Sequence, residues 1–200
     1  MTYAFDHRAK SGFARGEGTG CLILKPLSRA MADNDKIWSV IRNTGINSDG
    51  RTVGITAPNS KAQEQLIRDV YARAGIDPRD CGFVEAHGTG TKVGDPLEAS
   101  AIHAVFAEGR TSTRPLYIGS VKSNVGHLEP TSGIVSIIKA SLMLDKGFIL
   151  PNANYELENE QIPLAEWNMR VRLFPILPQC LRRLFMLASS FFFSVQKQKN

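Results

Sequence analysis

Two glycine-rich loops, each with one histidine, restrict the fold of this chain more than any other sequence feature. The first covers residues 87–95 (HGTGTKVGD) and the second covers residues 122–129 (KSNVGHLE). Each follows a short β-rich run, at 82–86 or 116–121, and precedes a helical segment. Repeated strand–loop–helix units indicate an α/β fold with a buried sheet. Functional groups in such folds gather beyond the carboxyl ends of the strands, where both histidines are expected.

The helical segments have recognisable ends. Ser60 and Gln63 fit a capping box for a helix over 60–74, and Gly75 would end it. Asp95 is predicted as the N-cap of a second helix that runs to about residue 107. Pro130 is predicted to open a third helix that stops before Gly147. The core face of this third helix is expected to contain Ile134, Ile137, Ile138 and Leu142.

The segments before residue 60 are less regular. Residues 19–25 (TGCLILK) are predicted to be a buried strand, and residues 26–34 a short helix. A second strand is expected over 37–42. The stretch 43–59 is rich in small polar residues and is predicted to be a long loop.

The chain divides into a body, residues 1–171, and a tail, residues 172–200, which is not expected to be a domain. Five of the 24 basic residues and none of the 19 acidic residues lie beyond residue 170, so the net charge of +5 belongs to the tail. A neutral body argues against nucleic acid as a partner. The apolar run 184–195 is too short to span a membrane. We expect a cytoplasmic protein with reduced thiols, because the three cysteines are widely spaced.

Two familiar nucleotide motifs fail in detail. Lys92 follows a glycine-rich stretch but is itself followed by Val93, where a P-loop needs serine or threonine. Gly16–Gly20 resembles a dinucleotide glycine run, yet it leads into a predicted strand instead of opening a helix.

His87 and His127 occupy equivalent positions after their strands, so they are candidates for paired catalytic imidazoles. Neutral imidazoles that donate N–H bonds can stabilise negative charge on a carbonyl oxygen. Zinc binding is the alternative role for the two histidines, but neither loop holds a third histidine or cysteine ligand, so no metal is expected. His103 lies within a predicted helix and is expected at the surface or in packing.

Several long motifs in one order resemble a known family. EAHGTGT, KVGDPLEA and VKSNVGHLE, with the flanks FARGEGTGCLILKPLS, IRNTGINSDGRTVGITAPN and LMLDKGFILPNANYE, resemble the ketosynthase (β-ketoacyl synthase) domain of polyketide and fatty acid synthases. The iterative fungal reducing type is most similar. The likeness extends from about residue 5 to about residue 171.

This resemblance implies a thiolase-like layered α/β/α/β/α fold, here incomplete and mainly its C-terminal half. It implies an acyltransferase that condenses an acyl thioester with malonyl-carrier protein by a decarboxylative Claisen reaction. The implied partners are acyl carrier protein, malonyl and acyl thioesters, and a second ketosynthase in a homodimer or mixed pair. No cofactor is expected in the domain itself, since the phosphopantetheine belongs to the carrier.

The resemblance also assigns site residues. His87 and His127 would hold the malonyl thioester oxygen, with Lys122 as a third catalytic group. Asp95, Glu98 and Glu129 would support them in a buried charged network. Thr89 and Thr91 would bond the phosphopantetheine arm.

The ends of the pattern depart from the family. The cysteine nucleophile should precede the segment FDHRAKSGFARGEG at residues 5–18, and Cys21, Cys81 and Cys180 lack its setting. Beyond Arg182 and Arg183 the expected glycine-rich turn is replaced, which suggests a shifted reading frame or read-through into an intron. Three functions stay open: part of a synthase completed by another polypeptide, an inactive remnant or pseudo-enzyme that pairs with an intact ketosynthase, and a carrier-binding module.

Overall fold

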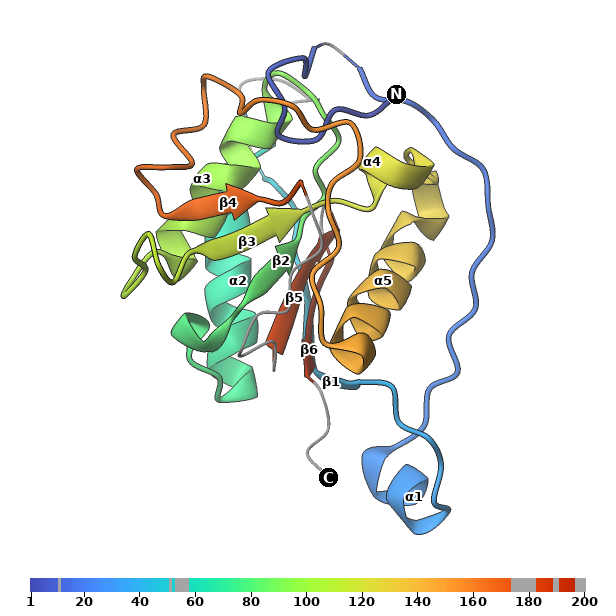
Figure 1. The fold of residues 1–200 in the computed structure, drawn as a ribbon. Helices are drawn as coiled ribbons and strands as arrows, with labels where there is room; N and C mark the ends of the chain where they lie inside the picture. Colours follow the sequence, from blue (N-terminus) through green and yellow to red (C-terminus); the bar gives the residue numbers. More distant parts are fainter. Residues whose placement is uncertain (11, 51, 53–57, 174–182, 189–190, 197–200) are drawn as a thin grey trace.

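A six-stranded sheet forms the centre of the computed structural model, which describes residues 1–10, 12–50, 52, 58–173, 183–188 and 191–196 (Figure 1). The strands in chain order are β1 (Val40–Ile46), β2 (Phe83–Glu85), β3 (Leu116–Gly119), β4 (Met169–Val171), β5 (Arg183–Ala188) and β6 (Phe191–Gln196). Their order across the sheet is β1-β6-β5-β2-β3-β4. β5, β2, β3 and β4 pair in parallel, whereas β6 is antiparallel to both of its neighbours.

Helices cover both faces of this sheet. The α-helices are α1 (Leu27–Ala32), α2 (Ser60–Ala74), α3 (Gly94–Phe106), α4 (Lys122–Val125) and α5 (Ser132–Lys146), and short 3-10 turns span Pro78–Asp80 and Glu129–Thr131. Figure 1 shows α2 and α3 on one face and α5 on the other. Side chains alternate along a strand, so Val84 packs in the core with α2 and α3 while Phe83 packs with α5. The α/β architecture predicted from the repeated strand–loop–helix units is confirmed.

The helix over 60–74 is confirmed at both bounds, but its predicted cap is wrong. Asn59 is the N-cap, because its side chain accepts hydrogen bonds from the backbone N–H groups of Lys61 and Ala62. Gly75 ends the helix in the left-handed conformation. The third predicted helix begins at Ser132, because Pro130 belongs to the preceding 3-10 turn.

The predicted strand over 19–25 is wrong. The segment is extended but pairs with no described strand, and Ile23 is 96% exposed. It runs past α5 toward α1, the predicted short helix (Figure 1). The Cα of Gly20 approaches α5 so closely that an added Cβ would meet Ile134. The later predicted strand is shifted to Val40–Ile46, so the predicted loop 43–59 begins inside β1; residues 51 and 53–57 of that loop lie outside the described residues.

The tail, which has neither helical nor alternating periodicity and was not expected to be a domain, supplies β5 and β6. The backbone of β5 fills the place beside β2, and both strands pack against α5. β6 has helix α2 on one side and α5 on the other, and strands covered in this way lack an alternating pattern that periodicity could reveal.

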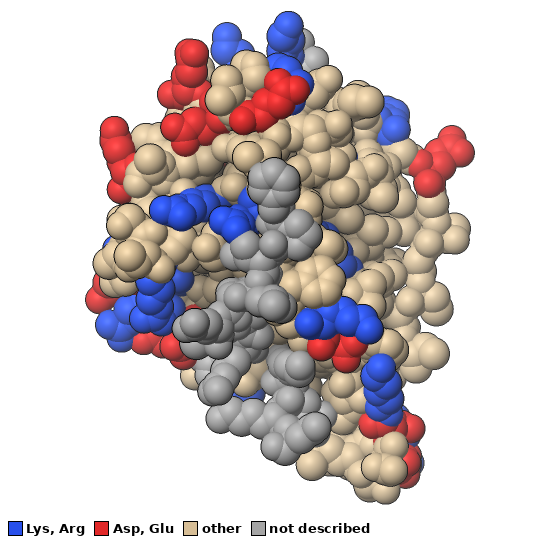
Figure 2. Space-filling model, viewed as in Figure 1, with Lys and Arg blue, Asp and Glu red and all other residues tan. Residues whose placement is uncertain are grey.

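On the face shown in Figure 2, the Lys and Arg side chains lie in several separate groups, some at the margins and some near the middle, and Asp or Glu side chains lie next to several of these groups. The described part of this face therefore shows no basic stripe of the kind that nucleic acid requires. Within the described residues, none of the helices has the length and hydropathy needed to cross a bilayer.

Candidate active site

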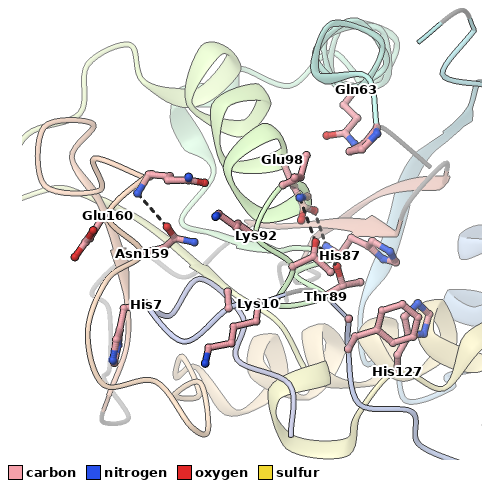
Figure 3. A pocket seen from close by; sticks show the side chains of 18 of the residues that line it. His7, Lys10, Gln63, His87, Thr89, Lys92, Glu98, His127, Asn159 and Glu160 are labelled. Atoms are coloured by element: carbon pink, nitrogen blue, oxygen red, sulfur yellow. Dashed lines mark hydrogen bonds between the residues drawn. The ribbon is translucent and has the colours of Figure 1, made fainter. Parts of the chain in front are cut away.

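The two histidine loops meet at one edge of the sheet. β2 and β3 are parallel neighbours, so the loops that follow them leave the sheet side by side. The ring centroids of His87 and His127 are 5.3 Å apart and the rings are nearly perpendicular. Figure 3 shows both rings, with Thr89, at one end of a cavity. The predicted convergence of the two histidines is therefore present in the structure.

His127 is held in one tautomer. Its Nδ1 accepts a hydrogen bond from the backbone N–H of Glu129 at 2.9 Å, and the hydroxyl of Ser132 lies 2.9 Å from the same nitrogen. An Nδ1 that accepts from an N–H carries no proton, so the neutral ring has its proton on Nε2. Burial and the charge of Lys122 lower the pKa of His127. The ring therefore offers an Nε2–H donor at neutral pH.

His87 is held through its backbone. The carboxylate of Glu98 accepts hydrogen bonds from the N–H groups of His87 at 2.6 Å and Gly88 at 2.8 Å. The hydroxyl of Ser120 donates to the carbonyl of His87 at 3.1 Å. The Nδ1 atom is buried and has no hydrogen-bond partner in the described part of the chain. Burial, followed by the positive charge of Lys122, lowers the pKa of His87 to about 3.

Lys122, Glu98 and Asp95 form the buried charged group behind the histidines. Lys122 is 1% exposed, and its Nζ has no hydrogen-bond partner among the residues described. Burial lowers its pKa, against the attraction of the carboxylates, Glu98 foremost. Burial raises the pKa of Glu98, and nearby Asp95 adds to the effect. Both shifts favour the neutral form of the group, because burial makes each separate charge costly.

Asp95 is not the N-cap that was predicted. Helix α3 begins at Gly94 with Val93 as its N-cap, two residues earlier than predicted. The buried carboxylate of Asp95 accepts hydrogen bonds from the N–H groups of Phe5 at 2.8 Å, Gly90 at 3.0 Å and Thr91 at 3.3 Å. Burial raises its pKa to about 6. Asp95 thus fastens the N-terminal segment to the first histidine loop.

Glu129 does not join this buried group. Its side chain is 42% exposed and forms an ion pair with Arg15. Glu129 has a positive φ of 52°. Its backbone N–H points to Nδ1 of His127, while its carboxylate faces solvent. The expectation of a buried Glu129 is therefore corrected, and its contribution to the site is its backbone N–H.

Thr89 and Thr91 line the same cavity as the histidines, which has a volume of about 1250 Å³. Their hydroxyl oxygens are 3.3 Å apart, and that of Thr91 accepts a hydrogen bond from the backbone N–H of Gly94. Lys10 and Lys92 also line the cavity, away from the histidines (Figure 3). Hydroxyls with free hydrogen-bonding capacity suit the amide groups of an extended ligand.

Of the cysteines, Cys180 lies outside the described residues, and neither of the other two lines the cavity. Cys21 is exposed on the extended N-terminal segment. Cys81 precedes β2 and its thiol donates to the carbonyl of Phe83, at the opposite end of the strand from His87. No group of three or more histidine, cysteine or acidic side chains suited to a metal occurs in the part of the chain that the structure describes.

The FARGEG segment, residues 13–18, is part of the site, although none of its residues was predicted as a site residue. The N–H of His127 donates to the carbonyl of Ala14 at 2.8 Å, and the N–H of Gly16 donates to the carbonyl of His127 at 3.0 Å. The ring of Phe13 packs 4.7 Å from that of His127. The glycine run rejected as a nucleotide motif is the signal that could have been used, because glycines permit such close backbone approach.

Gly16→Ala should displace the second histidine loop. A Cβ at Gly16 would clash with the carbonyl oxygen of Val125, a backbone atom that cannot swing away. We expect a loss of about 1–3 kcal/mol in the free energy of unfolding, with altered His127 resonances. Gly18→Ala is the control, because its Cβ would meet only the end of the flexible Leu128 side chain. Equal effects of the two substitutions in urea denaturation would contradict the prediction.

His87 should remain neutral in the folded chain well below pH 6. Its pKa of about 3 lies under the ordinary 6.5, so the folded state binds a proton less readily than the unfolded state. Its contribution to stability is therefore complete above pH 6.5 and is lost as pH falls toward 3. NMR titration of the imidazole, with urea denaturation of wild type and His87→Gln at pH 7.5 and 5, measures this. A titration midpoint near 6.5 would contradict it.

Residues 38–156 match the family model described as Beta-ketoacyl synthase, C-terminal domain. Highly-reducing polyketide synthase 1 of Aureobasidium melanogenum is 62% identical over 170 residues, which cover 85% of this chain and 8% of that protein. Reducing polyketide synthase PKS1 of Cochliobolus heterostrophus is 58% identical over 169 residues, which cover 84% of this chain and 7% of that protein. The chain thus spans less than a tenth of the length of these curated relatives.

Solved structures give the same result for the fold. The ketosynthase from module 6 of the bacillaene synthase from Bacillus subtilis 168 superposes with a TM-score of 0.89 at 36% identity, over 98% of this chain and 37% of that chain. The ketosynthase from module 1 of the bacillaene synthase from Bacillus amyloliquefaciens FZB42 superposes with a TM-score of 0.91 at 33% identity, over 100% and 39%. The predicted fold class, an α/β fold that matches part of a ketosynthase, is confirmed.

Proposed function

This chain belongs to the beta-ketoacyl synthase family, whose members perform Claisen condensation, and we propose that it supplies the two-histidine part of such an active site. The observation that carries the proposal is the pair of imidazoles, 5.3 Å apart, on the wall of one cavity. Burial lowers the pKa of both rings, so each is neutral near pH 7 and can donate an N–H bond.

The proposed substrate is malonyl thioester on an acyl carrier protein. His87 and the Nε2–H of His127 donate to the thioester carbonyl oxygen. When carbon dioxide leaves, the electron pair of the broken carbon–carbon bond forms an enolate, whose negative oxygen both donors stabilise. Such donors accelerate the step because they bind the enolate oxygen more strongly than the neutral carbonyl. Lys122, buried behind the two histidines, is proposed as the third catalytic group.

The carrier's phosphopantetheine arm is proposed to lie along Thr89 and Thr91, whose hydroxyls line the approach to the histidines. In the second half-reaction the enolate carbon attacks an acyl thioester and a thiolate leaves. Neither described cysteine lines the cavity, so the acyl-bearing cysteine is proposed to come from another segment or polypeptide. We further propose a cytoplasmic location and pairing with a second ketosynthase.

The rival proposal is a non-catalytic protein that binds a carrier or an intact ketosynthase. The distance of Cys81 from the cavity favours it, since covalent catalysis requires an activated thiolate within reach. Mass spectrometry of malonyl-carrier incubated with the purified chain separates the two. Conversion to acetyl-carrier above the buffer rate supports the enzyme. Binding of the carrier without conversion supports the rival.

A further inference from the structure

We propose that the buried ion pair between Glu85 and Lys139 is a positioning device that sets the relative placement of the two histidines. The inference deepens the proposed function and rests on it for its catalytic meaning. Neither residue lines the cavity, so both act through the elements that they join.

One carboxylate connects three elements. Glu85 is the last residue of β2, two positions before His87. Its Oε1 accepts a hydrogen bond of 2.6 Å from the backbone N–H of Val121, immediately before Lys122 and α4. Its Oε2 accepts a hydrogen bond of 2.7 Å from the Nζ of Lys139 on α5. The carboxylate therefore joins the exits of both strands to α5.

The connection reaches His127 along α5. Ser132, whose hydroxyl lies 2.9 Å from His127 Nδ1, and Lys139 are seven residues apart. That spacing is close to two helical turns, so both side chains emerge from one face of the helix. Both residues are buried, as is Ser136 between them. A shift or rotation of α5 that broke the Lys139 contact would also move Ser132 against His127.

The energetics of the Glu85–Lys139 ion pair indicate that it places the elements that it joins and adds little to the stability of the fold. Glu85 is 0% and Lys139 6% exposed, so both charges have lost most of their hydration. The free energy lost when two charges leave water can equal or exceed the attraction between them. Apolar residues of similar volume therefore often stabilise a fold equally well. An ion pair at this position demands one geometry, whereas apolar contacts tolerate sliding. Lys139 Nζ is 5.4 Å from the Phe83 ring centroid, which further restricts its position.

Three variants of the full chain test the inference. Lys139→Met removes the link but leaves an unpaired buried carboxylate, so loss of stability is expected. Glu85→Gln keeps an acceptor for Val121 but removes the charge. The double variant Glu85→Gln/Lys139→Met leaves no unpaired charge and still lacks the link, because the methionine side chain has no N–H or O–H to donate across the gap. Glu64→Gln, in an exposed pair with Arg68, is the matched control.

The readouts are the imidazole NMR spectrum of His127 and the kinetics of malonyl decarboxylation. In the double variant we expect stability near that of wild type, a shifted Nδ1 resonance, and kcat lower by about 10- to 100-fold with little change in KM. Glu64→Gln should match wild type in every measurement. Wild-type His127 resonances in the folded double variant would overturn the inference.

The two proposals fail in different ways. If wild type converts no malonyl-carrier, the proposed function fails, while the NMR comparison still decides whether the ion pair places His127. If wild type is active and the double variant retains both its spectrum and its kcat, the positioning role alone fails. Ile67→Val, a small change in the core on the opposite face of the sheet, controls for general loosening.

Discussion

His127→Asn is expected to lower the rate of malonyl decarboxylation about 100- to 1000-fold, the usual loss when one preorganised donor to a developing oxyanion is removed. The asparagine side-chain oxygen can replace Nδ1 as acceptor for the Glu129 N–H, so the loop remains anchored. What disappears is the Nε2–H donor. The loss should appear in kcat, because the donor acts mainly after the carbon–carbon bond begins to break.

His127→Gln tests the N–H donor separately from the imidazole ring, because glutamine keeps a donor but has no ring. Its amide nitrogen can reach toward the position of Nε2, so a weaker loss than that of His127→Asn is expected. His103→Gln is the histidine control, because His103 stacks on Trp167 at 4.5 Å and does not line the cavity. Its turnover should equal that of wild type when both are folded. Equal activity of His127→Asn and wild type would exclude His127 as an oxyanion donor.

Asp95→Ala should be among the most destabilising single substitutions in the chain. It leaves three N–H groups, of Phe5, Gly90 and Thr91, without their acceptor. Each buried unsatisfied donor costs about 1–3 kcal/mol, so we expect a loss of about 3–5 kcal/mol in the free energy of unfolding after partial relaxation.

Urea denaturation measures this loss, with Asp95→Asn and Asp69→Ala as comparisons. Asparagine keeps one acceptor oxygen, so its cost should be smaller. Asp69 accepts a hydrogen bond from Gln65 on the exposed face of α2, and its replacement should change stability by less than about 0.5 kcal/mol. A loss below about 1 kcal/mol for Asp95→Ala would show that water or a rearranged loop satisfies these donors.

Much of the fold could be predicted because its signals are local. Helix 60–74 has apolar residues at helical spacing and a glycine stop, and each loop histidine follows a short apolar strand. The segment 19–25 is equally apolar, but a strand needs a pairing partner as well as composition. No described strand lies beside it, so the prediction failed there. β5 and β6 form where composition alone suggested no regular element, because neighbouring strands offer them backbone partners.

The same distinction applies to the site. The motifs identified His87, His127, Lys122, Asp95 and Glu98, and the structure brings all five together. They also suggested Glu129, whose side chain faces solvent. They did not reveal Lys139, which is buried on a face of α5 other than the one expected to form the core. The predicted core face of α5 is largely wrong: of its four residues only Ile137 is buried, and Leu142 is 43% exposed.

By itself, the sequence determined the family, the α/β class and the two histidine loops, because spacing along the chain carries that information. Only the tertiary structure decided how those loops are held: Gly16 against the second loop, Glu85 between the strand exits, and α5 against His127. These contacts join residues far apart in the chain. Their formation depends on strand order and helix rotation, which the free energy of the whole packed fold selects and no local pattern encodes.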